Sequence, residues 1–399
     1  DTMDMQQMFA GRMSRLGTES AFEVLKKANE LEAQGKEVVH LEIGQPDFAT
    51  PDNIIEAAYR AMKNGCTGYT TTQGIPELRQ AIAEYYAAER NVPASADEVV
   101  VVPGGKPIMF FTMLALVEPG DEVLYPDPGF PIYESCIRFA GGIPVPMPIL
   151  QENGFKVDVE QMKRQVSEKT KLIILNSPGN PTGGVLDKAD VEAIAQVVRT
   201  TNAMVMSDEI YDRLIFTDQK PFSIASIPDM KERTIILNGF SKTYAMTGWR
   251  LGYGIMNREM AEKVTLLMVN SNSCAANFTQ VAAVEAIRGP QDSVEKMRLA
   301  YQERLEYLTG ALNAIEGMEC LMPGGSFYAF PSIEKLGVDD KEFADRLLTE
   351  GGVAALAGSA FGIYGKGHIR LSAANSMENL QRAVELLRAF VEKIRAEQK

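Results

Sequence analysis

The chain has 399 residues, of which 45% are hydrophobic and 23% charged, and its formal net charge is -13. This composition is typical of a folded soluble protein with two or three domains' worth of chain. The acidic balance argues against a nucleic-acid or anionic-membrane surface, and the longest apolar run, residues 108–117, is too short to span a bilayer. The first nine residues, DTMDMQQMF, contain neither the basic n-region nor the apolar h-region of a signal peptide, so no signal peptide is expected there.

Histidines and cysteines are scarce. The only two histidines are His40 and His368, so a histidine triad, relay or histidine-rich metal site is close to excluded. The four cysteines lie far apart without a C-x-x-C pair, which favours reduced thiols in a cytoplasmic protein over disulfides, and no metal site is expected. Acid–base chemistry must therefore use another group, and lysine is the leading candidate.

The pattern along the chain predicts an α/β fold. A helix is expected over residues 18–35, a short strand over 38–43, and helices over 52–63 and 77–90. Further on, β-branched apolar runs predict strands at 98–102, 122–125, 171–175, 203–207, 234–238 and 251–256. Helices are expected between several of them, at 106–117, 131–139, 187–200 and 258–270. This alternation is typical of a mostly parallel sheet with helices on both faces.

The pattern changes after Gly289-Pro290. The sequence predicts a long charged helix over 291–315, then a strand over 326–330, a helix over 340–350, a strand over 367–372 and a final amphipathic helix from Ser376. We therefore expect three parts: an N-terminal segment (1–45) that packs on the small domain, a large domain (46–288) and a small C-terminal α/β domain (289–399).

The segment from Asn238 to Gly254, NGFSKTYAMTGWRLGYG, directly follows a predicted strand. Lys242 would lie in the turn at the carboxyl end of that strand, where open α/β sheets bind ligands. It could form a Schiff base with a carbonyl cofactor such as pyridoxal phosphate, and Arg250 could hold a phosphate. Taken alone, however, the segment is more simply explained by a surface lysine and an arginine near a loop.

Two glycine-rich turns also follow predicted strands. Residues 103–106 (PGGK) lead into a helix, so their backbone N–H groups could bind a phosphate, although a plain tight turn explains them equally well. Neither a Walker A loop nor a G-x-G-x-x-G fingerprint is present. Residues 176–184 (NSPGNPTGG) form a rigid loop, in which the amide of Asn180 could donate to a phenolate or carboxylate.

Three more polar residues lie in strand-like surroundings. Asp208 ends a predicted strand, where it could cap a helix or keep a heterocyclic nitrogen protonated. Tyr211 follows three residues later and would share its side if a helical turn follows. Arg370 lies in an apolar run, where its guanidinium needs a partner: an internal carboxylate or a ligand carboxylate.

Together, N-P-T-G (180–183), D-E-x-Y (208–211), S-K-x-x-x-x-x-G-x-R (241–250) and the late Arg370 resemble the class I/II aminotransferases of pyridoxal-phosphate fold type I, the family of aspartate aminotransferase. The resemblance runs from about residue 14 to the final helix. It implies a large domain with a mostly parallel seven-stranded sheet between helices, plus a smaller α/β domain.

The resemblance also implies roles for individual residues. Lys242 would carry pyridoxal 5'-phosphate and move the proton, Asp208 would pair with the ring nitrogen, and Tyr211 and Asn180 would bond the phenolic oxygen. At the phosphate, the resemblance implies the backbone amides of Gly105 and Lys106, together with Ser241 and Arg250. Phe130 would stack on the ring, and Tyr69 would reach in from a neighbouring subunit. Arg370 would bind the substrate α-carboxylate, assisted by Gly44 and Asn180.

The implied reaction transfers an amino group from an L-amino acid to a 2-oxo acid, with 2-oxoglutarate or pyruvate expected, by a ping-pong cycle through pyridoxamine phosphate. The expected assembly is a homodimer with shared active sites, and residues 272–280 resemble the loop that crosses the interface. A β-lyase, decarboxylase or cyclase on the same scaffold is the alternative. A non-catalytic cofactor sensor and a nicotinamide dehydrogenase have less support, because a basic DNA-binding segment and a dinucleotide fingerprint are missing.

The chain departs from the family pattern at three positions. Gly239 stands where relatives often have a serine, Leu114 where some aspartate-specific relatives have a lysine, and Glu19 where relatives often have a proline. No clamp for a side-chain carboxylate is evident, so the amino donor could be neutral, aromatic, basic or acidic.

Overall fold

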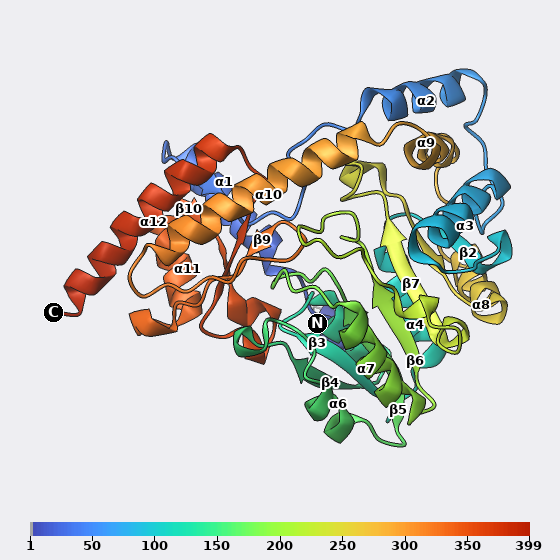
Figure 1. Ribbon diagram of the computed structural model, residues 1–399, viewed down its shortest axis with the longest axis horizontal. Helices are drawn as coiled ribbons and strands as arrows, with labels where there is room; N and C mark the ends of the chain where they lie inside the picture. Colours follow the sequence, from blue (N-terminus) through green and yellow to red (C-terminus); the bar gives the residue numbers. More distant parts are fainter. Residues whose placement is uncertain (1–2) are drawn as a thin grey trace.

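The computed structural model describes residues 3–399. Residues 1 and 2, which belong to the predicted N-terminal segment 1–45, lie outside the described residues. Its centre is a seven-stranded sheet with the strand order β2-β8-β7-β6-β5-β3-β4 (Figure 1). The strands are β2 (Val99–Val102), β3 (Glu122–Asp127), β4 (Ile143–Pro148), β5 (Thr170–Asn176), β6 (Met204–Asp208), β7 (Thr234–Gly239) and β8 (Gly252–Ile255). Only β8 runs antiparallel to its neighbours, which confirms the mostly parallel seven-stranded sheet predicted from the sequence.

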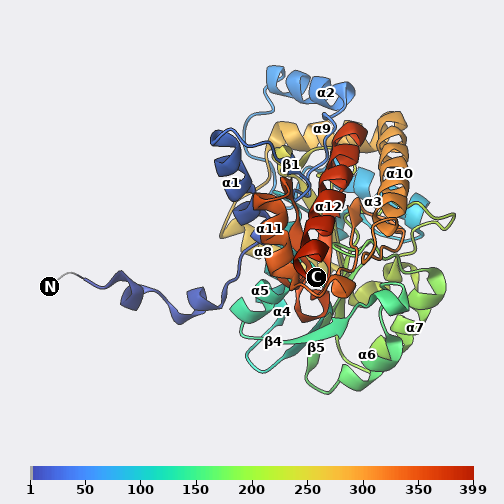
Figure 2. The ribbon, with the colours of Figure 1, turned by 90° about the vertical axis from the view of Figure 1, so that its left-hand side faces the viewer.

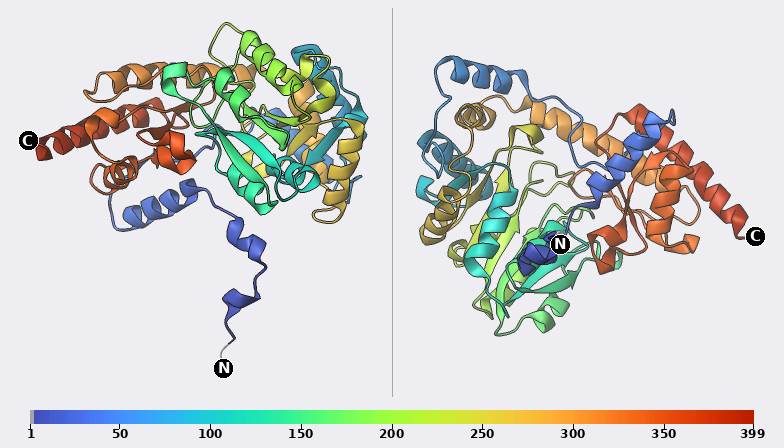
Figure 3. Two further views of the ribbon diagram at one scale, coloured as in Figure 1. Left: turned by 90° about the horizontal axis from the view of Figure 1, so that it is seen from below. Right: turned by 180° about the vertical axis from the view of Figure 1, so that it is seen from behind.

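Helices cover both faces of this sheet (Figures 1 and 3). They are α2 (Asp52–Lys63), α3 (Pro76–Arg90), α4 (Lys106–Leu116), α5 (Ile132–Phe139), α6 (Val159–Gln165), α7 (Lys188–Arg199), α8 (Arg258–Val269) and α9 (Asn277–Arg288). The alternation of side chains along β2 shows the two faces: Val99 and Val101 pack with α3 and α9, whereas Val100 and Val102 pack with α4 and α8. A strand buried on both faces has to be apolar throughout, which is why this run contains four valines.

The sequence prediction was wrong about several elements. It missed β4, whose residues read IPVPMP, because proline lacks the N–H that a sheet ladder uses. The structure tolerates these prolines because β4 is an edge strand with one neighbour, β3. The sequence prediction also missed α6, and it assigned residues 272–280 to a loop, although α9 begins at Asn277. The predicted strand over 38–43 is reduced to β1 (Val39–His40).

The C-terminal part of the chain forms two small sheets and three helices. Its elements are α10 (Asp292–Asn313), β9 (Tyr328–Ala329), α11 (Asp340–Thr349), β10 (Val353–Ala354), β11 (Leu356–Ala357), β12 (Ile369–Ser372) and α12 (Met377–Glu397). Strands β11, β12 and β9 form an antiparallel sheet in that order, and β10 pairs in parallel with β1. The apolar stripes of α10 and α12 share one core cluster around Phe327 and Tyr328.

The N-terminal segment contacts this C-terminal part. Helix α1 (Ser20–Ala33) places Ala28 in a small cluster with Leu348 and Ala354, next to the β1–β10 pair. The start of the described chain projects away from the body of the molecule (Figures 2 and 3). The chain rejoins the body before α1, where Arg15 donates to the backbone oxygens of Arg138 and Phe139 and the backbone N–H of Gly17 donates to Oγ of Ser135. The domain boundaries at residues 45 and 288 stay predictions. Within residues 3–399, none of the helices combines the length and the apolarity needed to cross a membrane.

Candidate active site

A cavity of about 500 Å³ opens at the carboxyl ends of strands β5, β6 and β7, and residues from β11 and β12 complete its wall. This edge of a parallel sheet is where α/β proteins bind ligands. The cavity brings together all the predicted site residues except Tyr69: Gly44, Gly105, Lys106, Phe130, Asn180, Asp208, Tyr211, Ser241, Lys242, Arg250 and Arg370. Tyr69 is 90% exposed and lies outside the lining.

Lys242 lies in the turn after β7 and extends into the cavity. Its Nζ donates a hydrogen bond to the backbone oxygen of Gly44. Burial lowers the pKa of Lys242 to about 8, and the positive charges of Arg370 and Arg250 act in the same direction. The amine is therefore far more available as a base near neutral pH than the amine of an ordinary lysine, whose pKa is about 10.4.

Asp208 is the last residue of β6 and is only 5% exposed. Its Oδ2 accepts a hydrogen bond of 2.5 Å from the hydroxyl of Tyr133, and its Oδ1 accepts one of 3.2 Å from the backbone N–H of Ile210. Burial raises the pKa of Asp208 to about 6, although these hydrogen bonds act in the opposite direction. The carboxylate is ionised at neutral pH and lies in the same cavity as Lys242, where a cationic partner would stabilise it.

Tyr211 lies one turn after Asp208, and the structure places both on the wall of the cavity, as the D-E-x-Y spacing predicts. The Tyr211 hydroxyl is 2.8 Å from the hydroxyl of Tyr328. Burial raises the pKa of Tyr211 well above its ordinary value, so the hydroxyl stays protonated and can donate a hydrogen bond. Gly44 packs against Tyr328, and a Cβ on Gly44 would lie 2.1 Å from Oη of that tyrosine.

The turn between β2 and α4 forms a cationic corner of the cavity. Gly104 has φ +83° and lies directly against Arg250: a Cβ there would be 2.2 Å from the guanidinium Nη2. Gly105, which caps α4, and Lys106, its first residue, line the same corner together with Ser241. A helix N-terminus, a hydroxyl and a guanidinium that converge in this way are suited to an anion such as a phosphate.

Arg370 lies in β12 and is only 4% exposed. Its guanidinium donates to Oδ1 of Asn180 at 3.0 Å and to the backbone oxygen of Glu42 at 2.6 Å, and Cζ lies 4.2 Å from the ring centroid of Tyr328. Within residues 3–399, no carboxylate forms an ion pair with Arg370, and its Nε has no hydrogen-bond partner. The internal salt bridge that the sequence left open is therefore absent from the described chain, and the arginine is poised for a ligand carboxylate.

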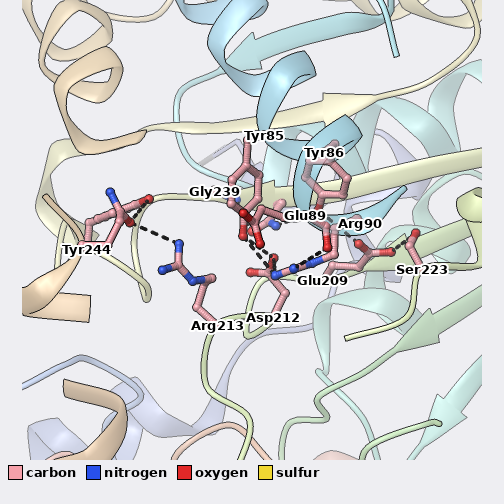
Figure 4. Close-up of polar contacts among 12 residues, drawn as sticks. Tyr85, Tyr86, Glu89, Arg90, Glu209, Asp212, Arg213, Ser223, Gly239 and Tyr244 are labelled. Carbon is pink, nitrogen blue, oxygen red and sulfur yellow. Dashed lines mark hydrogen bonds and ion pairs between the residues drawn. The ribbon is translucent and has the colours of Figure 1, made fainter. Parts of the chain in front are cut away.

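A buried polar network lies behind the turn that carries Asp208 and Tyr211 (Figure 4). On one side, Glu209 accepts hydrogen bonds from Tyr86 at 3.1 Å and from Ser207 and Ser223 at 2.7 and 2.8 Å. Burial raises the pKa of Glu209. These contacts fasten the start of the turn to α3 and to the neighbouring loop.

On the other side of the network, Asp212 forms an ion pair of 2.8 Å with Arg90, and the hydroxyl of Tyr85 lies within hydrogen-bond distance of both (Figure 4). Glu209 and Asp212 thus anchor the turn to α3. The residue directly before each of them, Asp208 and Tyr211, faces the cavity. The network fixes the backbone from which these two side chains project.

Sequence reasoning missed Tyr133, Tyr328 and the contact between Lys106 and Glu19. Tyr133 lies three residues after Phe130, and Tyr328 follows a Gly-Gly-Ser turn; these neighbours are the only local signals. It also gave weight to Leu114, which is 40% exposed on α4 and lies outside the cavity lining. Leu114 therefore does not line this pocket.

Comparison with known proteins agrees with this geometry. The family model "Aminotransferase class I and II" matches residues 36–387. The aspartate aminotransferase of Bacillus sp. (strain YM-2) is 39% identical and covers 97% of this chain and the whole of that protein. The solved aspartate aminotransferase of Thermus thermophilus with maleate superposes with a TM-score of 0.92, at 36% identity, covering 96% of this chain and 99% of that one. The aromatic aminotransferase of Pyrococcus horikoshii OT3 superposes with a TM-score of 0.88, at 38% identity, covering 92% and 99%.

The match spans most of the chain and includes the cavity whose residues the motifs predicted. The similarity favours amino-group transfer over the lyase, decarboxylase and cyclase alternatives. The chain belongs to the class I and II aminotransferases, and it is a pyridoxal-phosphate-dependent enzyme that transfers amino groups.

Proposed function

We propose that the cavity catalyses transamination between an L-amino acid and a 2-oxo acid, with Lys242 as the residue that carries pyridoxal phosphate and moves the proton. One observation carries this proposal: Lys242, whose pKa is lowered to about 8, shares one cavity with the buried carboxylate Asp208 and with Arg370, which lacks an internal carboxylate partner among residues 3–399.

The cavity fits the cofactor at each of its polar ends. The phosphate suits the corner formed by the backbone N–H groups of Gly105 and Lys106, the hydroxyl of Ser241 and the guanidinium of Arg250. Gly104 has no side chain, which allows the guanidinium of Arg250 to lie against it. The buried Asp208 suits a protonated ring nitrogen, and the hydroxyl of Tyr211 and the amide of Asn180 suit the phenolic oxygen. Phe130 also lines the cavity and can stack on the ring.

When bound, pyridoxal phosphate withdraws electrons from the substrate's Cα, so that a proton can leave that carbon. The remaining work belongs to the chain. Arg370 binds the α-carboxylate with both prongs of its guanidinium, and Asn180 and the backbone of Gly44 hold the substrate beside it. Lys242 Nζ accepts the Cα proton, because its lowered pKa keeps much of the amine neutral near pH 8.

The finer assignments are part of the same proposal. The names of the relatives support acidic or aromatic amino acids as donors, and 2-oxoglutarate or pyruvate as acceptors remain predictions. The high exposure of Tyr69 supports its use by the cavity of a second copy in a homodimer. A division at residues 45 and 288, a cytoplasmic location and a role in amino-acid biosynthesis also stay predictions.

An absorption experiment tests the function directly. Purified protein with pyridoxal phosphate should show a visible band that a suitable amino acid alone bleaches and a 2-oxo acid restores. The Lys242→Ala variant should lose this response and transamination while keeping its circular-dichroism spectrum. Release of ammonia or pyruvate from the amino acid, without need of an acceptor, would instead establish the lyase reaction. Substantial turnover by Lys242→Ala would show that another lysine carries the cofactor.

A further inference from the structure

The charged side chains of the cavity outnumber the charges that the proposed reaction uses. Among the described residues, the lining contains four cations and two carboxylates: Lys106, Lys242, Arg250, Arg370, Glu19 and Asp208. In the proposed function, Lys242 engages the cofactor carbonyl, Arg250 the phosphate and Arg370 the α-carboxylate, while Asp208 pairs with the ring nitrogen. Glu19 and the side chain of Lys106 are left over.

These two remaining groups pair with each other across the cavity. Nζ of Lys106 donates to Oε1 of Glu19, although the residues are 87 positions apart in the sequence. Lys106 begins α4 at the cationic corner, whereas Glu19 directly precedes α1 on the N-terminal segment. The Glu19 side chain is 19% exposed, and Nζ of Lys106 lies 5.6 Å from the ring centroid of Phe130. The Lys106 side chain is 49% exposed, so the pair stands at the rim of the cavity, with Glu19 on the more buried side.

The cavity also has apolar lining residues: Ala21, Phe22, Ile43, Met109, Phe130 and Leu356. Phe130 lies against Lys106, and Ala21 and Phe22 follow closely after Glu19 in the chain. Phe22 is 65% exposed, so it stands at the mouth of the cavity and not in the core. With Lys106 and Glu19 neutralising each other, this region offers a substrate side chain apolar surface and no uncompensated charge.

We propose that Glu19 is a specificity-determining residue: by holding Lys106, it makes the pocket select amino acids with neutral apolar or aromatic side chains over acidic ones and, of the two predicted acceptors, pyruvate over 2-oxoglutarate. This inference rests on the proposed function, because it takes Arg370 as the site of the α-carboxylate. An acidic substrate has to separate Lys106 from Glu19 before its own carboxylate can use the ammonium, and it then meets the carboxylate of Glu19 nearby. Specificity thus comes from a repulsive group as much as from an attractive one.

The test compares donors in the holoenzyme. The wild-type protein should bleach faster with phenylalanine or leucine than with aspartate. Glu19→Gln keeps the size of the side chain and removes its charge, so kcat/KM for aspartate should rise about tenfold while the value for phenylalanine changes less than about twofold. Adding Lys106→Met to Glu19→Gln should cancel this gain, because the freed ammonium is the group that binds the acidic side chain.

A binding measurement separates the inference from turnover. Calorimetry with succinate, an unreactive dicarboxylate, should give a dissociation constant about tenfold lower for Glu19→Gln than for the wild type. Glu23→Gln is the matched control: it removes the same charge from the exposed face of α1, outside the cavity lining, and should change neither measurement. Glu19→Ser should repeat the Glu19→Gln result, in case the amide forms new contacts.

The outcomes are distinct. An unchanged aspartate-to-phenylalanine ratio in both Glu19 variants would overturn the inference. Loss of activity with lysine or ornithine, with aspartate unaffected, would overturn it too, because Glu19 would then bind a cationic substrate. If none of the amino acids bleaches the wild-type band, the proposed function fails; tighter succinate binding by Glu19→Gln would still support the role of the pair.

Discussion

Lys242 and Asp208 have pKa values shifted toward each other by the same cause. Burial disfavours the charged form of each, so it lowers the pKa of the lysine to about 8 and raises that of the aspartate to about 6. At neutral pH, Asp208 still carries its charge, while Lys242 is close to the point at which it gives up its proton. A pair arranged in this way supplies a fixed negative charge and a usable base within one cavity.

The lowered pKa of Lys242 predicts a pH-dependent stability of the cofactor-free protein. Because the unfolded lysine has a pKa near 10.5 and the folded one near 8, burying the ammonium costs free energy in full below about pH 8. This cost is lost as the pH rises from about 8 to 10.5. The unfolding free energy of the wild type should therefore rise through this window relative to that of Lys242→Met, as measured by urea denaturation at several pH values. Parallel curves for the two proteins would contradict the lowered pKa.

The residues that sequence reasoning identified share one property: each belongs to a short motif directly after a predicted strand. Lys242, Asp208 and Asn180 were identifiable because the carboxyl ends of neighbouring parallel strands meet at one edge of the sheet. Tyr133 and Tyr328 belong to no such motif. Their contacts with Asp208 and Tyr211 bridge 75 and 117 residues, respectively, and local pattern carries no information about such partners.

Among the elements, the turn after β6 depends on α3 for its position. Arg90 and Asp212 are 6% and 4% exposed, and their ion pair is part of the network in Figure 4. Replacing one partner of a buried pair leaves the other charge without compensation, which costs about 3–5 kcal/mol. Arg90→Met should lower the unfolding free energy by about this amount in urea denaturation, and adding Asp212→Asn should restore part of it.

An exposed pair provides the control for that prediction. Arg258 and Glu262, on α8, are 72% and 68% exposed and 3.6 Å apart. Because exposed pairs contribute little, Arg258→Met should change the unfolding free energy by less than about 1 kcal/mol. An equal loss from Arg90→Met and Arg258→Met would mean that the buried network does not hold the turn.

Strand β4 shows why one element escaped prediction. Its three prolines remove ladder donors, which argues against a strand in any central position. At the edge of the sheet, only one side of the strand needs partners, and residues from Ile143 to Pro148 align in parallel with β3. Position in the sheet, and not local propensity, decides this case.

At the scale of the whole molecule, the cavity lies between parts that are distant in sequence. The large sheet contributes Asp208 and Lys242, the N-terminal segment Glu19 and Gly44, and the C-terminal strands Arg370. Substrate binding at Arg370 and cofactor binding near Lys242 therefore engage different parts of the fold. Chemistry assembled in this way depends on how those parts pack together.

The exposure of Tyr69 predicts that activity needs a second copy of the chain. Tyr69 is 90% exposed and lies outside the cavity of its own chain, so it can affect cofactor binding only by reaching the phosphate site of a second copy. We expect Tyr69→Phe, which removes one hydroxyl donor, to weaken pyridoxal-phosphate binding about tenfold. Sedimentation should find a dimer for both proteins, and cofactor titration gives the affinities. Full activity from a verified monomer would contradict the shared site.

The sequence by itself determined the fold class, the motifs that follow the predicted strands and the chemistry that those motifs imply. It could do so because strand ends and turn residues are local features of the chain. Tertiary structure alone decided which side chains meet: Tyr133 with Asp208, Glu19 with Lys106, and Arg370 with no internal carboxylate in the described chain. The physical reason is that these contacts depend on strand order and on the packing of the chain's two ends, which a linear pattern does not encode. The general reaction is therefore evident from the sequence, whereas the inferred substrate preference depends on the folded pocket.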